Sequence, residues 1–271
     1  MARTILITGG ASGLGRAMVE GLLPDGHRVA IGDLNQQSIE ETLAANGDAG
    51  ERLAAFQVDL ASPGACERLV ADVEARFGPI DVIVNNAGIG SAAVNDQGQP
   101  RRFWEAPPEI YDRIFAVNAT APFRLASILA PGMIERGWGR IVNVTTGLQP
   151  MLRVCFYGGS KAATEAHTSC MALQLEGSGV TANVITPGGH TYTAMTRNSG
   201  IPEQQMYKAT IMAGPIRWLA SDASNGVNAR RFVGRLWDNS LPPDAAAEIA
   251  GFPVAWTGFG ASQTASLHEQ A

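Results

Sequence analysis

The chain has 271 residues, of which 45% are apolar and 17% are charged, with a formal net charge of −5 at pH 7. This length is enough for one large α/β domain with a full hydrophobic core. The acidic balance argues against nucleic-acid binding, and because no apolar run approaches about 18 residues we expect a cytoplasmic protein with no membrane partner. Three cysteines without metal-ligand spacing predict free thiols and no metal site.

Runs rich in valine and isoleucine alternate with stretches of helical periodicity. The expected strands are 4–8, 28–32, 54–58, 81–84, 140–144, 181–185 and 232–236, and the clearest helices are 14–23, 36–45, 63–77 and 109–134. This alternation predicts an α/β, three-layer Rossmann fold: a seven-stranded parallel sheet with helices on both faces. Residues 1–238 are expected to form a single domain. Residues 239–271 form an expected C-terminal arm, packed on the domain or on a neighbouring subunit, with a frayed end.

The first strand leads into a glycine-rich turn, Thr8-Gly9-Gly10-Ala11-Ser12-Gly13-Leu14-Gly15. Glycines let the backbone approach a pyrophosphate, and the following helix offers free N–H groups to the anion. Asp33 follows 18 residues after Gly15, at the end of the second strand, where a carboxylate can accept hydrogen bonds from a ribose diol. The carboxylate would repel a 2′-phosphate, and neither Ser12 nor Leu34 supplies a cation for one. The turn therefore predicts NAD as the cofactor, the alternative being a structural turn with a solvated aspartate.

Polar or small residues also follow the third and fourth strands. Asp59 and Leu60 follow the third strand, and Asn85-Asn86-Ala87-Gly88 follows the fourth. These positions fall at the carboxyl edge of a parallel sheet, where such folds bind their ligands. Asp59 is suited to receive the adenine amino group, and the small Ala87 and Gly88 let adenosine lie against the backbone. Each could alternatively be an ordinary turn.

A tyrosine and a lysine lie four residues apart in Tyr157-Gly-Gly-Ser-Lys161, in a chain whose only other lysine is Lys208. On a helix this spacing places both side chains on one face. A neighbouring cation favours phenolate, so we expect the pKa of Tyr157 to be lowered toward the range where it exchanges a proton with an alcohol or ketone. The alternative is a solvent-exposed pair without a function.

Together these motifs resemble the short-chain dehydrogenase/reductase family, in its compact single-domain branch, over about residues 3–237. The matching motifs are the glycine turn, Asp59, Asn85-Asn86-Ala87-Gly88, Asn118 in Val-Asn-Ala-Thr, Arg140-Ile-Val-Asn-Val, Tyr157-x3-Lys161 and Pro187-Gly188. The resemblance implies a Rossmann-type NAD(P) enzyme that interconverts an alcohol and a carbonyl compound. It further implies that Tyr157 transfers the proton, that Lys161 binds the nicotinamide ribose, and that Asn118 holds a water linking the lysine to solvent.

The sequence departs from the family where a serine usually polarises the substrate oxygen. Here the hydroxyl pair is Thr145-Thr146, and Thr146 lies only eleven residues before Tyr157, so the intervening loop is shorter than usual. A threonine keeps the hydroxyl that can hydrogen-bond a developing alkoxide, although its methyl group narrows the pocket. Thr146 is therefore the expected partner of the substrate oxygen, with Thr145 as the rival.

Two further departures affect the cofactor loop and the assembly. The segment after Pro187 and Gly188 is longer than the family's, and Thr193 is the expected contact of the nicotinamide carboxamide, with Thr191 as the rival. Residues 235–239 replace a glycine pair that usually ends the last strand, so the geometry of the expected homodimer or homotetramer is open.

The expected mouth of the site is bordered by 89–104, 147–156 and 190–206, which are rich in apolar and aromatic residues. This composition favours an apolar, aromatic or cyclic secondary alcohol or its ketone as the small-molecule substrate. Cys155 and His190 are expected to have no catalytic role. Two other functions remain open: reduction of an activated C=C bond, which usually needs a wider Tyr–Lys spacing, and a weakly active NAD-binding sensor or scaffold.

Overall fold

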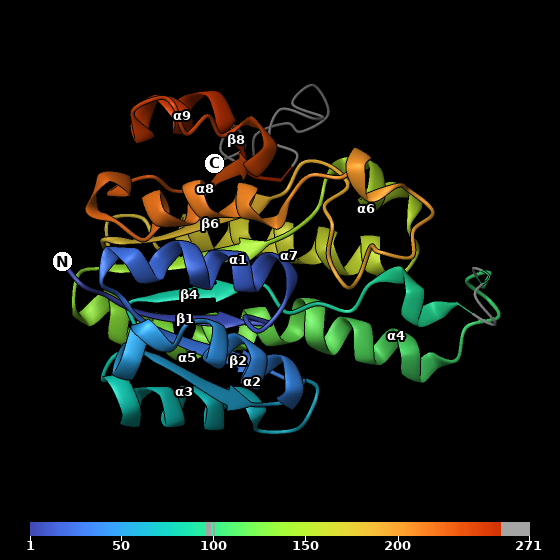
Figure 1. Cartoon of the computed structure of the whole chain (residues 1–271), viewed down its shortest axis with the longest axis horizontal. Helices are drawn as coiled ribbons and strands as arrows, with labels where there is room; N and C mark the ends of the chain where they lie inside the picture. The colour runs from blue at the N-terminus through green and yellow to red at the C-terminus, as the bar shows by residue number, and fades with distance from the viewer. Residues whose placement is uncertain (96–98, 100, 256–271) are drawn as a thin grey trace, which may run out of the picture.

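The computed structural model describes residues 1–95, 99 and 101–255, which form a sheet with helices on both faces (Figure 1). The strands are β1 (Thr4–Thr8), β2 (Arg28–Asp33), β3 (Leu53–Gln57), β4 (Val82–Asn85), β5 (Gly139–Val144), β6 (Val180–Thr186), β7 (Arg230–Val233) and β8 (Gly251–Pro253). Their order is β3-β2-β1-β4-β5-β6-β7-β8. The first seven strands pair in parallel, which confirms the predicted Rossmann-type sheet.

The predicted strand number was wrong by one, because β8 adds an antiparallel strand at the β7 edge. It comes from the expected C-terminal arm, which also contains α9 (Pro243–Ala250) and packs on the domain. The register pairs Arg231 with Phe252. The predicted frayed end of the arm lies outside the described residues. The seventh strand also ends earlier than expected, since Gly234–Leu236 is a 3₁₀ turn.

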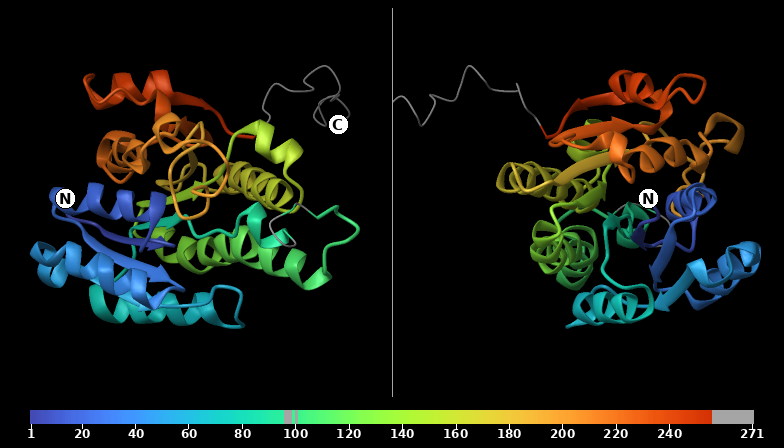
Figure 2. Two further views of the ribbon diagram at one scale, coloured as in Figure 1. Left: turned by 45° about the vertical axis from the view of Figure 1, so that its right-hand side comes forward. Right: turned by 90° about the vertical axis from the view of Figure 1, so that its left-hand side faces the viewer.

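The helices divide between the two faces of the sheet. They are α1 (Gly13–Leu22), α2 (Gln36–Ala45), α3 (Ala65–Phe77), α4 (Pro108–Phe115), α5 (Ala121–Glu135), α6 (Leu148–Arg153), α7 (Tyr157–Gln174) and α8 (Ala213–Leu219), besides α9. Figure 2 shows helices on both sides of the sheet. One cluster of buried side chains joins α1, α2, α8 and α9 to the sheet, and a second joins α3, α5 and α7 to its other face. Within β1, Ile5 and Ile7 enter the first cluster and Leu6 the second, because strand side chains alternate between faces.

The long helix expected at 109–134 is interrupted by one π-helical turn, Ala116–Thr120, between α4 and α5. The continuous stretch Pro108–Glu135 is long and apolar enough to cross a membrane by length and composition. Half of its most apolar window is buried inside the protein, where α5 packs against α3 and α7. It therefore has the packing of a core helix, and its π-helical turn places Asn118 in the interior.

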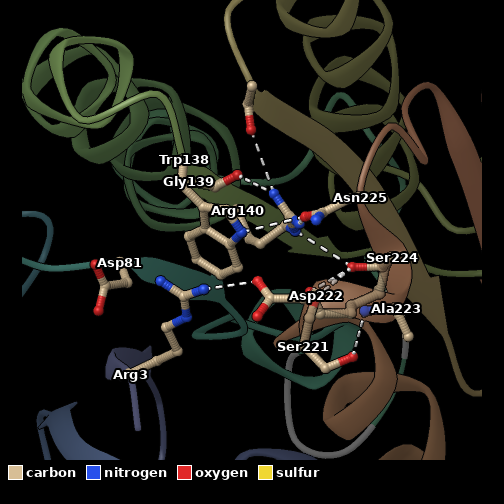
Figure 3. A network of polar contacts seen from close by, with 12 residues as sticks. Arg3, Asp81, Trp138, Gly139, Arg140, Ser221, Asp222, Ala223, Ser224 and Asn225 are labelled. Atoms are coloured by element: carbon tan, nitrogen blue, oxygen red, sulfur yellow. Dashed lines mark hydrogen bonds and ion pairs between the residues drawn. The ribbon is translucent and has the colours of Figure 1, made fainter. Parts of the chain in front are cut away.

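A fully buried arginine closes the amino-terminal edge of the sheet (Figure 3). Arg140 lies at the start of β5 and donates hydrogen bonds to Gly139 O, Gly179 O, Ser224 Oγ and Asn225 Oδ1. Its guanidinium also lies 4.1 Å from the centre of the Trp138 ring. Burial lowers the pKa of Arg140 to about 10, below its usual 12.5. Arg140 therefore links β5 by hydrogen bonds to the segments that precede β6 and β7. These bonds lie at the amino-terminal edge of the sheet, opposite the edge that carries the glycine turn.

Replacing Arg140 with leucine is expected to lower the free energy of unfolding by about 3 kcal/mol, because several buried acceptors lose their donor. Cofactor affinity should stay unchanged, since the change lies at the far edge of the sheet. Urea unfolding checks the stability. The control is Arg217→Leu, which breaks the half-exposed pair with Asp25 and should cost at most about 1 kcal/mol. Equal losses for the two variants would contradict the assigned role of Arg140.

Candidate active site

The end of β5 is hydrogen-bonded to α7 through three consecutive residues. The pairs are Val144 with Lys161, Thr145 with Glu165, and Thr146 with Tyr157. The three partners on α7 are spaced four residues apart, so they share the helix face that looks toward the sheet. This arrangement brings the predicted Thr146, Tyr157 and Lys161 together at the carboxyl edge of the parallel strands.

Of the two threonines, Thr146 is the one available to a substrate. The Thr145 hydroxyl is buried and donates to Glu165 Oε2 at 2.7 Å. The Thr146 side chain is half-buried and hydrogen-bonds Tyr157. The geometry therefore favours Thr146 over its rival, and its contact with a substrate oxygen remains a prediction.

The pKa of Tyr157 is raised above 10, mainly by desolvation, while the hydrogen bond from Thr146 acts in the opposite direction. The expectation of a lowered pKa is thus wrong. The spacing to Lys161 predicted the wrong direction because it carries no information on the burial of the phenol. Among the described residues, Lys161 is not one of the groups that shift the pKa of Tyr157.

Lys161 is 5% exposed, and its Nζ donates to the carbonyl of Val144 at 2.9 Å. Desolvation lowers the pKa of Lys161 from 10.5 to about 8. A Cβ built on Gly88 would lie 3.5 Å both from this Nζ and from Asn118 Oδ1, an ordinary contact distance, so Gly88 lies next to both side chains. The ammonium therefore lies at the junction of β4, β5 and α7, beside the strand ends.

Asn118, in the π-helical turn, is held by hydrogen bonds to both atoms of its side-chain amide and to its backbone carbonyl. Its Oδ1 accepts from Ile89 N at 2.7 Å, and its Nδ2 donates to Ile89 O and Ser160 Oγ at 3.0 Å. Its backbone carbonyl accepts the Thr164 hydroxyl at 2.7 Å. A carbonyl oxygen has two lone pairs, so this one can also accept a hydrogen bond from a water. The water relay that the family resemblance implies therefore remains a prediction.

The shortened loop between Thr146 and Tyr157 contains α6, a helix that the sequence reading missed. The loop ends in a γ-turn centred on Phe156, which has φ 64 and ψ −63. In this turn Tyr157 N donates a hydrogen bond to Cys155 O at 2.8 Å. This conformation is strained for a residue with a side chain. The strained residue lies directly before Tyr157, so the short connection constrains the backbone where α7 begins.

The glycine turn packs closely against the end of β4. A Cβ on Gly9 would lie 2.8 Å from Ala87 Cα, and one on Gly15 would lie 2.0 Å from Gly9 O, so both positions require glycine. Asn86 donates through Nδ2 to Thr8 O and Gly9 O, which holds the turn in place. Its contact is with the turn itself, a role the sequence did not suggest.

These residues fit a dinucleotide. The Ser12 side chain does not cap the first turn of α1, so the amides of this turn are left for an anion at the positive end of the helix dipole. Ala11 N and Asn35 N both donate to the Asp33 carboxylate at 3.0 Å, which fixes its orientation beside the turn. This donor and acceptor set matches a pyrophosphate followed by a ribose diol.

The two leucines that follow Asp33 and Asp59 differ in exposure. Leu34 is 55% exposed next to Asp33, and Leu60 is half-buried against the second core cluster. Asp59 bonds Ala61 N through Oδ1 and pairs with Arg113 at 3.0 Å through Oδ2. Contact of Asp59 with an adenine amino group would therefore compete with this surface ion pair.

The loop after Pro187 and Gly188 lies across the glycine turn. Thr193 contacts the turn closely, since a Cβ on Gly13 would lie 3.2 Å from its Cβ and methyl carbon. Thr191 is instead buried, and its hydroxyl donates to Gly189 O. Thr193 is thus the better placed of the two to reach a nicotinamide, and its contact remains a prediction.

Replacing Lys161 with methionine is expected to raise the free energy of unfolding by up to about 3 kcal/mol at pH 7, the penalty that a pKa shift from 10.5 to about 8 represents. Below pH 8 the lysine is charged in both folded and unfolded chains, so the gain is largest there. It shrinks as the pH rises to 10.5, because the folded lysine is already neutral. Urea unfolding at several pH values measures it. Lys208→Met, at the exposed second lysine, is the control; a pH-independent gain would refute the assignment.

Comparison with known proteins agrees with this geometry. The sequence matches the short chain dehydrogenase family over residues 3–204. It is 32% identical over 238 residues to acetoacetyl-CoA reductase of Allochromatium vinosum, covering 83% of this chain and 93% of that protein. It is 29% identical over 219 residues to D-beta-hydroxybutyrate dehydrogenase of Cupriavidus necator, covering 78% and 82%.

A solved structure of actinorhodin polyketide ketoreductase with NADPH has the same fold, with a TM-score of 0.73 and 26% identity over 86% of this chain and 95% of that one. The family match, the shared fold and the assembled Tyr157 and Lys161 are mutually consistent. The chain belongs to the short-chain dehydrogenase family, whose members are oxidoreductases that use a nicotinamide cofactor on small-molecule substrates.

Proposed function

We propose that the protein interconverts a secondary alcohol and its ketone with NAD as the cofactor. The observation that carries this proposal is the junction of β5 and α7, which places the hydroxyl of Thr146 on the phenol of Tyr157 with Lys161 one helical turn further on. A hydroxyl, a proton donor and a cation on adjacent positions are what transfer of a proton to or from a carbonyl oxygen requires.

When bound, the nicotinamide supplies the hydride acceptor or donor. The Thr146 hydroxyl hydrogen-bonds the substrate oxygen, and Tyr157 exchanges the proton with it. Because the pKa of Tyr157 is raised, the phenol is protonated at neutral pH and suited to protonate a ketone oxygen. Removal of an alcohol proton needs the ionised phenol, so oxidation should be favoured by alkaline pH.

The choice of NAD over NADP rests on Asp33. Its carboxylate is held by two backbone amides beside the glycine turn, so it cannot easily swing away from a ribose. A 2′-phosphate there would meet a fixed negative charge. The ketoreductase of similar fold was crystallised with NADPH, which makes the carboxylate at this position the feature to test.

The proposed substrate is apolar, aromatic or cyclic. Large apolar side chains are exposed on the segments expected to border Tyr157, namely Leu148, Leu152, Tyr192 and Met195. Tyr111 stacks on Phe115 at 4.4 Å and meets the Phe156 ring edge-on, which adds an aromatic wall next to the γ-turn. Such surroundings favour burial of an apolar substrate body.

Replacing Tyr157 with phenylalanine is expected to reduce kcat at least about 100-fold, because the proton donor is lost, while NADH affinity stays unchanged. NADH absorbance with a panel of aromatic, cyclic and aliphatic secondary alcohols measures turnover. Tyr207→Phe, at an exposed tyrosine outside the segments expected to border the site, is the control for aromatic replacement. Wild-type binding of NAD without turnover of any alcohol would support a sensor or scaffold, and a Tyr157→Phe variant with near-normal kcat would exclude the proposed mechanism.

Replacing Asp33 with asparagine is expected to narrow the preference for NADH over NADPH by about tenfold or more, since an amide keeps the size of the carboxylate without the charge that repels a phosphate. The amide retains only one of the two acceptor oxygens that bond Ala11 N and Asn35 N. Dissociation constants from nicotinamide fluorescence give the ratio. Asp59→Asn is the matched control, because it should change both affinities by one factor. An unchanged ratio in Asp33→Asn would show that another residue sets the preference.

A further inference from the structure

A buried ion pair lies directly behind the two threonines. Glu165 of α7 and Arg231 of β7 have side chains 0% and 15% exposed, and both Nε and Nη2 of Arg231 lie 2.8 Å from Glu165 Oε1. Charges removed from water stabilise a fold only weakly, even when paired, and an apolar pair of similar volume often does as well. The remaining hydrogen bonds of this pair show what else it does.

Those bonds go to the threonine pair. Arg231 Nη1 donates to the backbone carbonyl of Thr146 at 3.1 Å. Glu165 Oε2, the oxygen not used by the arginine, accepts the Thr145 hydroxyl at 2.7 Å. One ion pair therefore holds one threonine by its side chain and the next by its backbone, which restrains the backbone that carries the Thr146 hydroxyl.

The pair lies at one end of a segment that is strained at its other end. Between Thr146 and Tyr157 the chain forms α6 and then the γ-turn at Phe156, whose φ is positive. Strain of this kind persists only where the surrounding structure fixes both ends. Tyr157 is fixed by α7, so an anchor is needed at Thr146, and Arg231 supplies it.

The C-terminal arm completes the contacts of the carboxylate. The amide of Ala255 donates to Glu165 Oε1 at 3.1 Å, and β8 is paired with β7 so that Phe252 is opposite Arg231. The described part of the arm thus reaches the threonine pair through Glu165.

We propose that Glu165 and Arg231 are positioning residues that hold the Thr146 hydroxyl on the phenol of Tyr157, and that the C-terminal arm completes this unit through the Ala255 amide. The proposal rests on the proposed function insofar as it assigns the pair to turnover. Neither residue exchanges a proton with the substrate; both act through the threonines.

The test compares Arg231→Lys with Arg230→Lys. A lysine keeps the charge but has one donor nitrogen where Arg231 uses three, so it cannot keep all of the bonds to Glu165 and Thr146 O. Arg230 precedes it on β7 and its side chain points to the opposite face of the sheet. We expect kcat to fall about 10- to 100-fold in Arg231→Lys with NADH affinity unchanged, and to stay near wild type in Arg230→Lys. Equal kcat in the two variants would overturn the proposal.

A second variant separates positioning from stability. Glu165→Gln combined with Arg231→Met removes both charges, so no unpaired charge is left buried and the fold should be retained. We expect kcat to fall as in Arg231→Lys, although urea unfolding stays close to wild type. A folded double variant with wild-type kcat would show that the pair is only structural and would overturn the proposal.

A readout without turnover distinguishes failure of this proposal from failure of the proposed function. In protein with carbon-13-labelled tyrosine, the NMR signal of Tyr157 is identified by its loss in Tyr157→Phe. We expect this signal to shift in Arg231→Lys and in the double variant, because the Thr146 hydrogen bond is disturbed, and to stay in place in Arg230→Lys. An unmoved signal in all three overturns the proposal, whereas wild-type inactivity on every alcohol overturns only the proposed function.

Discussion

The hydrogen bonds between the end of β5 and one face of α7 are the constraint on which the site depends. They join Val144 to Lys161, Thr145 to Glu165 and Thr146 to Tyr157. Each of these three consecutive residues is bonded to a different turn of α7, so a shift of the helix along the sheet would break all three hydrogen bonds. The hydroxyl, the phenol and the ammonium are therefore placed by the packing of a helix on a sheet, which is a more rigid support than a loop.

The same junction explains why the site tolerates a short loop before Tyr157. The chain between the threonine pair and α7 ends in a γ-turn with a positive φ at Phe156. The buried Glu165–Arg231 pair anchors the first end of this segment, and the packing of α7 anchors the second. The arm of α9 and β8, at the edge of the sheet, is connected to the site through this pair.

Much of the fold and part of the site follow from spacing alone. The alternation of strands and helices predicted the parallel sheet, and the glycine turn with Asp33 predicted a dinucleotide site whose close contacts the structure shows at Gly9 and Gly15. The antiparallel β8 was missed because three residues, Gly251–Pro253, carry no strand pattern. Glu165 lies four residues after Lys161, a signal that a search along the helix face could have found, whereas Arg231 carried none.

The sequence by itself determined what depends on neighbouring residues: the elements, the glycine turn, and the shared helix face of Tyr157 and Lys161. Only the tertiary structure decided which threonine faces the phenol and that burial raises the pKa of Tyr157. It also joined Arg231 to Glu165, 66 residues away. The reason is physical, because hydrogen-bond partners and desolvation are set by segments distant in the chain, which local periodicity does not encode.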